Sequence, residues 1–238
     1  MGITLAVDTS SYVLGVAVLQ DGQVLADVTT HIKKNHSLRL MPAIADVLKE
    51  LSIEPKQLTN MVVAVGPGSY TGVRIGVTTA KTLAWTLDIP LVGVSSLELM
   101  AQQGRYFSGR ICPIIDARRG RVYTGLYACD EGSVIQQQEE CLMDLSDWLD
   151  QLALSTQPVL FTGADLNLHQ ELIREKLGDL AHFAPPTMQL PRPAELAALG
   201  EEKNPVSDVH SLVPNYLQLS EAEAKWQEAQ GIRGKENE

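Results

Sequence analysis

A glycine-rich turn within residues 65–76 constrains the fold of this 238-residue chain more than any other feature. It follows a short apolar run, residues 61–65, of the kind that forms a buried central strand. Gly66 and Gly68 allow a backbone turn that a side chain would block, and Ser69 can cap a helix that starts there. This order of strand, turn and helix predicts an α/β protein with a site at the turn.

The turn admits two interpretations. Amides at a helix N-terminus attract anions, so the layout resembles a loop that holds phosphate. The segment nevertheless lacks a Walker lysine and the GxGxxG spacing, and a tight strand-to-helix turn needs glycine for steric reasons alone. The residues favour the steric explanation and leave a nucleotide loop open.

Small residues recur at four-residue spacing along the helix predicted at residues 70–87. Gly72, Gly76 and Ala80 form a ridge with little side chain, and Val73 lies beside it. Such a ridge lets another backbone approach closely. The neighbour is either the protein's own sheet or a helix of a partner, and the spacing fits both.

Composition excludes some classes of function. The formal net charge is −10, and the one basic cluster is Arg118, Arg119 and Arg121, so the chain alone lacks the basic stripe that nucleic acid requires. No apolar run is long enough to span a membrane, and the chain starts directly with a strand rather than a signal peptide. We therefore expect a cytoplasmic protein with no membrane association.

Periodicity predicts two units with the same order of elements, βββαβα. The first unit has strands at residues 3–8, 14–20, 23–30, 61–65 and 91–94, and helices at 37–51, 70–87 and from 95 onward. The second has strands at residues 110–116, 121–129, 134–141 and 158–161, and helices at 145–152 and 166–177. Ser37 is expected to cap the helix at 37–51. Each unit opens with a strand that ends in aspartate, at Asp8 and Asp116.

This duplication is the plan of the actin, hexokinase and Hsp70 type of fold, a relative of RNase H, with the second unit degenerate. We expect a first subdomain at residues 1–105 and a second at 106–190. A C-terminal helical segment at 191–220 is expected to pack back on the first subdomain. A polar tail at 221–238 follows it.

In that fold the aspartates at the ends of these two strands face a cleft and contact a metal-bound nucleotide. Here Asp116 is followed by Arg118 and Arg119 where glycines are expected, so the aspartates serve either an ATP site or only the turns. The residues of this vestigial cleft are Asp8, Ser10, Ser11, Gly66, Gly68, Ser69 and Asp116. The five histidines never occur at the i, i+3 or i, i+4 spacing of a helical metal site, so we expect no metal, no cofactor and no catalytic residue.

Four segments together resemble the bacterial YeaZ/TsaB family: LAVDTSS, HSLRLMPAI, GPGSYTGVRIG and DARRGRVYTGLY. The resemblance implies a non-catalytic subunit in the synthesis of N6-threonylcarbamoyladenosine at position 37 of tRNA. The implied partners are the homologous catalytic subunit TsaD, also called YgjD, and the ATPase TsaE. It further implies tRNA contact only through the complex and a homodimer when TsaD is absent.

Members of the family bury their first two main helices against a partner, which corresponds here to residues 37–51 and 70–87. The resemblance thus implies an interface at Leu40, Met41, Ile44, Leu48, Gly72, Val73, Gly76 and Ala80. Gln218 follows Leu217 where arginine is expected, so a contact of that arginine is in doubt. The alternative function is an enzyme acting alone, either an ATP-dependent phosphotransferase of the actin-like superfamily or a glycoprotease-like peptidase.

Overall fold

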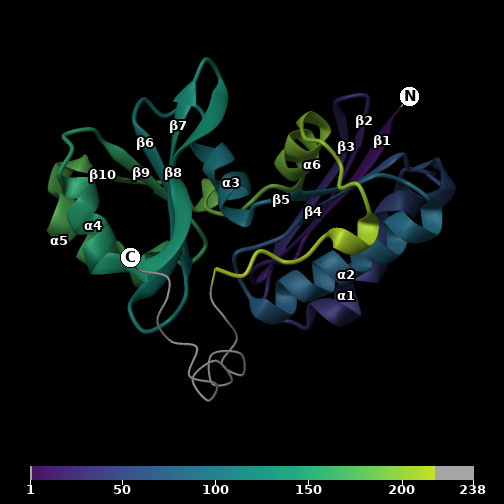
Figure 1. Ribbon diagram of the computed structural model, residues 1–238, viewed down its shortest axis with the longest axis horizontal. Helices are drawn as coiled ribbons and strands as arrows, with labels where there is room; N and C mark the ends of the chain where they lie inside the picture. The colour runs from purple at the N-terminus through teal and green to yellow at the C-terminus, as the bar shows by residue number, and fades with distance from the viewer. Residues whose placement is uncertain (1, 218–238) are drawn as a thin grey trace.

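The computed structural model describes residues 2–217 and has two lobes, each built on a five-stranded sheet (Figure 1). The predicted polar tail at 221–238 and the departure at Gln218 lie outside the described residues. No helix within residues 2–217 has the length and apolar character needed to cross a membrane.

Lobe 1 has the strand order β3-β2-β1-β4-β5. β1 lies antiparallel to β2 and parallel to β4, so it is the central strand, and all six of its residues are buried. The elements are β1 (Ile3–Asp8), β2 (Val13–Gln20), β3 (Gln23–His31), α1 (His36–Glu50), β4 (Asn60–Ala64), α2 (Tyr70–Leu87), β5 (Leu91–Val94) and α3 (Ser96–Ala101).

Lobe 2 repeats this topology, because β8-β7-β6-β9-β10 corresponds strand by strand to the order in lobe 1. β6 is antiparallel to β7 and parallel to β9, as β1 is to β2 and β4. The elements are β6 (Arg110–Asp116), β7 (Arg121–Asp130), β8 (Ser133–Asp144), α4 (Leu145–Ala153), β9 (Val159–Thr162), α5 (Gln170–Leu177) and β10 (Ala181–Phe183). The predicted duplicated fold is confirmed.

Helices cover both faces of each sheet. In lobe 1, α1 and α2 cover one face, and α6 (Pro193–Glu202) packs on β1 and β2 from the other (Figure 1). In lobe 2, α4 and α5 cover one face while α3 packs on β6 from the other. α3 follows β5 of lobe 1 directly, so this helix joins the two lobes through a buried core.

Most element boundaries differ from the predictions by one to three residues. The helix predicted at 166–177 is a 3-10 turn followed by α5, and β10 was not predicted. Two further differences concern α1 and the C-terminal segment. The cap of α1 is Asn35 rather than Ser37, because the Asn35 side chain accepts a hydrogen bond from the Ser37 amide at 3.1 Å. Within the C-terminal segment predicted to be helical, α6 starts at Pro193, while the chain from 203 to 217 is extended apart from one 3-10 turn. We call residues 203–217 the strap.

The strap runs back along lobe 1, shown as the yellow segment beside α2 in Figure 1. The amide of Val206 donates to the Leu91 carbonyl at 2.9 Å, and that of Asn215 donates to the Val65 carbonyl at 2.7 Å. Lys81 of α2 donates to the carbonyls of His210 and Leu212, at 2.9 Å each. The strap is therefore tied to both the sheet and α2.

The small-residue ridge of α2 packs on the protein's own sheet. Thr9 donates its hydroxyl to the Gly72 carbonyl at 2.7 Å. A Cβ atom on Gly76 would lie 2.6 Å from the Thr9 hydroxyl and 3.6 Å from Val63, so only a glycine fits. Ala80 is fully buried on the same face. The prediction that this ridge meets a partner is wrong.

The apolar stripe of α1 also packs on the protein's own sheet. Leu40, Ile44 and Leu48 are buried in the core of lobe 1, as is Val73 of α2, because the amphipathic faces of both helices turn toward the sheet. Of the eight residues predicted for the interface, Met41 is the exposed one, at 47%. Any partner contact on these helices must use their outward faces.

We expect Gly76→Leu to lower the free energy of unfolding by about 3 kcal/mol, because four extra carbons would overlap Thr9 and Val63. The matched control is Thr78→Leu, an exposed position two residues further along the same helix, which should shift it by no more than about 0.5 kcal/mol. Urea titration followed by circular dichroism measures both. A Gly76→Leu protein as stable as the control would contradict this packing.

Candidate functional site

The predicted cleft residues of lobe 1 surround the turn between β1 and β2. Asp8 ends β1, is only 1% exposed, and accepts a hydrogen bond from the Ser10 amide at 2.8 Å. Its second oxygen, Oδ2, has no hydrogen-bond partner among the residues that the structure describes. Burial raises the pKa of the Asp8 carboxyl, which favours its neutral form. A buried carboxyl of this kind is poorly suited to hold a hydrated metal ion.

The glycine-rich turn lies directly against the Asp8 turn. The Ser69 amide donates to the Ser10 carbonyl at 2.7 Å, and a Cβ atom on Gly68 would approach that carbonyl to 2.2 Å. The Ser69 hydroxyl caps α2 by accepting from the Gly72 amide at 3.3 Å. Gly66 has a φ of 100°, a conformation that favours glycine. The chain's own carbonyl thus occupies a position where a phosphate oxygen would bind.

Ser11 connects the same turn to α1. Its carbonyl lies 2.8 Å from Nε2 of His36, the first residue of that helix. His36 is 9% exposed, and its Nδ1 has no partner among residues 2–217. In that part of the chain, no three His, Cys, Asp or Glu side chains converge as metal ligands. Four predicted residues, Asp8, Ser10, Gly68 and Ser69, are brought together, and their mutual contacts are structural.

The corresponding turn of lobe 2 is closed in a different way. Asp116 lies 3.2 Å from Nε2 of His169, and its amide donates to the Asp165 carboxylate at 3.2 Å. Arg118 and Arg119 adopt left-handed φ angles of 67° and 55°, where the fold has glycines, and both are exposed. Asp116 therefore contacts groups of its own lobe and is not joined to Asp8.

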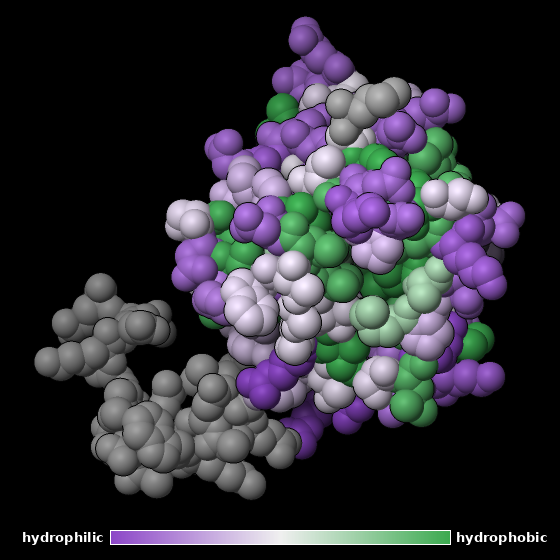
Figure 2. Space-filling view, turned by 90° about the vertical axis from the view of Figure 1, so that its right-hand side faces the viewer, coloured by the Kyte–Doolittle hydropathy of each residue, from purple (hydrophilic) through white to green (hydrophobic). Residues whose placement is uncertain are grey.

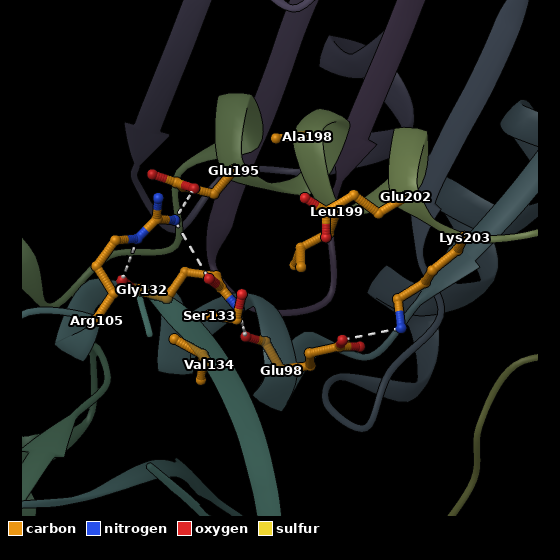
Figure 3. A pocket seen from close by; sticks show the side chains of 11 residues that line it. Glu98, Arg105, Gly132, Ser133, Val134, Glu195, Ala198, Leu199, Glu202 and Lys203 are labelled. Atoms are coloured by element: carbon orange, nitrogen blue, oxygen red, sulfur yellow. Dashed lines mark hydrogen bonds and ion pairs between the residues drawn. The ribbon is translucent and has the colours of Figure 1, made fainter. Parts of the chain in front are cut away.

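A polar pocket of about 300 Å³ lies at the opposite end of β7 and β8 from the Arg118 turn (Figure 3). Two ion pairs line it: Lys203 with Glu98, at 2.9 Å, and Arg105 with Glu195. Both pairs connect α6 to the α3 region, and the charges of each pair satisfy one another. The pocket is thus part of the junction between the lobes.

The second link across the junction uses Glu140 of β8. Tyr127 of β7 donates its hydroxyl to this carboxylate at 2.7 Å, and the Ser95 hydroxyl, which caps α3, also donates to it. Leu97 and Met100 of α3 also pack in one buried cluster with Ile111 of β6 and Tyr127 of β7. Together these contacts join the two lobes through α3.

The outward faces of α1 and α2 carry exposed apolar side chains. The sequence predicted one of them, Met41, as an interface residue and missed Leu38, Tyr70 and Trp85. Leu38 is 73% exposed and Trp85 is 66% exposed, while Met41 and Tyr70 are exposed by 47% and 39%. Figure 2 looks onto lobe 1 and shows hydrophobic areas between the hydrophilic ones. A signal was present: α2 contains no acidic residue, although the whole chain has a net charge of −10. A surface helix without acidic residues is typical of a contact face.

Because burial raises its pKa, Asp8 favours the folded state most at low pH and loses that contribution as the pH rises through its folded pKa. We expect Asp8→Asn to remove this dependence, so that the variant gains stability relative to the natural protein as the pH rises above about 4, the ordinary pKa of an aspartate. Urea titration at several pH values measures the difference. Asp46→Asn, an exposed position on α1, is the control and should show no such trend.

The chain is similar in sequence to proteins of tRNA modification. Residues 23–226 match the family model for TsaD, described as tRNA N6-adenosine threonylcarbamoyltransferase. The tRNA threonylcarbamoyladenosine biosynthesis protein TsaB of Bacillus subtilis is 53% identical over 95% of this chain and 98% of that protein. Its Escherichia coli namesake is 36% identical over 57% of this chain and 59% of that protein.

A solved structure supports the same grouping. YeaZ from Pseudomonas aeruginosa superposes with a TM-score of 0.77 at 27% identity, covering 91% of this chain and 100% of that one. A second Pseudomonas aeruginosa structure, described as an uncharacterized protein with similarity to the peptidase YeaZ, has the same TM-score at 26% identity. With these relatives and the motifs of lobe 1, the chain belongs to the YeaZ/TsaB family, as the sequence motifs predicted.

Proposed function

We propose that this protein is the non-catalytic subunit of the complex that installs N6-threonylcarbamoyladenosine at position 37 of tRNA. It pairs with and activates TsaD, the ATPase TsaE joins the pair, and tRNA is bound only by the assembly. The names of the TsaB relatives and the match to the TsaD family model support this role. The proposed compartment is the cytoplasm, and the subunit needs no cofactor.

One observation carries the non-catalytic part of the proposal: the Ser10 carbonyl fills the turn where an actin-like enzyme would hold phosphate. The Ser69 amide already donates its hydrogen bond to that carbonyl, and Asp8 is buried. The turn of lobe 2 has Arg118 and Arg119 in place of glycines. In lobe 1 the Ser69 amide at the start of α2 is therefore already bonded, and in lobe 2 two arginine side chains stand where glycines would let a phosphate approach the backbone.

The two enzymatic alternatives have less support. A phosphotransferase of this fold closes its lobes around the substrate, and here α3 and the Glu140 contacts across the junction oppose such a movement. A serine peptidase needs a base beside its nucleophile. The Ser69 hydroxyl caps α2, and His36 is bonded to the Ser11 carbonyl instead.

The exposed apolar side chains of α1 and α2 support a docking face for TsaD. Leu38 and Met41 point outward on α1, and Trp85 does so on α2. Exposed aromatic and aliphatic side chains of this size mark protein interfaces. A second copy of the chain uses the same face when TsaD is absent, so the homodimer and the heterodimer exclude each other.

We expect the isolated protein neither to bind nor to hydrolyse ATP, since both phosphate turns are closed, and to support formation of the modified nucleoside only when TsaD and TsaE are added. Calorimetry with Mg-ATP measures the first, and nucleoside analysis of tRNA by mass spectrometry measures the second. TsaD and TsaE without this protein are the control. A micromolar Kd for ATP that disappears in Asp8→Ala would refute the non-catalytic assignment.

The net charge leads to a related prediction about tRNA binding. With a charge of −10, the protein alone should give no gel shift with tRNA at about 0.15 M salt, because phosphate contacts supply most of the affinity there. The assembled complex should give one. A submicromolar shift by the lone protein would require a direct role in reading tRNA.

We expect Leu38→Asp to weaken assembly with TsaD by about 100-fold without lowering the melting temperature, because it places a charge in the docking face and leaves the core unchanged. The control is Leu154→Asp, since Leu154 is 89% exposed on lobe 2. Light scattering gives the assembly state, and a thermal melt gives the stability. Equal assembly by the two variants would exclude this face.

A further inference from the structure

Two tyrosines fix an arginine on the surface of lobe 1. Tyr70 and Arg74 lie one turn apart at the start of α2, and Tyr216 comes from the strap. The Arg74 guanidinium lies 4.1 Å from the centre of the Tyr70 ring and 5.7 Å from that of Tyr216. Arg74 Nε donates to the Tyr216 hydroxyl at 2.7 Å, and the two rings stack at 5.1 Å.

This geometry leaves one edge of the guanidinium available. Nε is used by Tyr216, and one planar face is covered by the Tyr70 ring. Arg74 itself is exposed, and the hydrogen bond that the structure shows from its guanidinium within residues 2–217 uses Nε, which leaves the edge with the two terminal nitrogens for a further partner. A surface arginine normally loses much side-chain entropy when it binds, but the two tyrosines have already restricted this one.

The surroundings favour an anion at that edge. α2 contains no aspartate or glutamate, and Arg74 lies in the first turns of the helix, near the positive end of its dipole. A guanidinium whose terminal nitrogens are free pairs with planar carboxylates through two parallel hydrogen bonds. The site is therefore prepared for one carboxylate.

We propose that Arg74, held by Tyr70 and Tyr216, receives a carboxylate side chain of the partner subunit and anchors the heterodimer at this point. This inference rests on the proposed function, because it assigns a contact within the same assembly. Arg74 shares its outward stripe on α2 with Thr78 and Trp85, so the anchor is continuous with the docking face.

A protein carboxylate fits better than RNA for two reasons. The Tyr70 ring already stacks on Tyr216 and contacts the Arg74 guanidinium, so a base cannot replace either contact on Tyr70 without breaking the cluster. RNA binding also needs several cations, and the other basic residue of α2, Lys81, is bonded to two carbonyls of the strap.

Arg74→Gln tests the proposal, with the full-length chain and purified TsaD. We expect the Kd for TsaD to rise about 30-fold, the size of an interface hot spot, with an unchanged melting temperature. Arg74→Lys should keep the charge but lose most of the affinity, because lysine cannot form the paired hydrogen bonds. Arg119→Gln removes the same charge from an exposed position on lobe 2, away from the docking face, and should change the Kd less than about 2-fold.

Tyr216→Phe separates positioning from charge. It keeps the ring beside Arg74 and removes the hydroxyl that accepts from Nε, so we expect an affinity loss between those of the control and Arg74→Gln. Salt gives an independent readout. Raising the salt from about 0.1 M to about 1 M should weaken the natural pair more than the Arg74→Gln pair.

Each further outcome has a defined meaning. If Leu38→Asp breaks the assembly while Arg74→Gln binds TsaD normally, the arginine anchor is wrong and the proposed function stands. If Arg74→Gln leaves the Kd for TsaD unchanged but weakens tRNA binding by the assembled complex, the anion is an RNA phosphate, and the carboxylate proposal is overturned. If neither Leu38→Asp nor Arg74→Gln affects assembly, the docking face itself is excluded.

Discussion

The close approach of α2 to the turn between β1 and β2 determines the rest of lobe 1. The Thr9 hydroxyl donates to the Gly72 carbonyl, and the Ser10 carbonyl accepts from the Ser69 amide. Backbones can come this near only where no Cβ intervenes, and a Cβ on Gly72 would lie 2.1 Å from the Thr9 carbonyl. The glycines that resemble a phosphate loop therefore serve contact between two parts of the same chain, and that contact fills the space a phosphate would need.

Packing that uses one face of a helix leaves the opposite face for something else. On α2 the small residues turn to the sheet, so Arg74, Thr78 and Trp85 turn outward. The side chains of α2 that form the core and those that form the contact face thus lie on opposite sides of the same helix. A substitution on the outward face can therefore change a partner contact while the buried side chains of α2 keep their packing.

Local signals in the sequence were enough to predict the fold. The strand, turn and helix order placed α2 at its observed bounds, and the repeated strand ending in aspartate indicated two units of one topology. The direction of the glycine ridge could not be predicted, since i, i+4 spacing suits a sheet and a helix equally. The Arg74–Tyr216 bond joins residues 142 positions apart, and the strap has no periodicity, so no local pattern reveals this contact.

Lobe 2 supports the view that the chain is retained as a scaffold. Its equivalent turn holds Arg118 and Arg119 in left-handed conformations, which cost about 1 kcal/mol each for residues with a side chain. The sheet beside them is well packed around Trp148 and Phe161. That sheet supplies Ile111 and Tyr127, on which α3 rests. The sheet of lobe 2 is therefore well packed where it supports α3 and the first lobe. The turn at Arg118 and Arg119, by contrast, departs from the glycines of a nucleotide site.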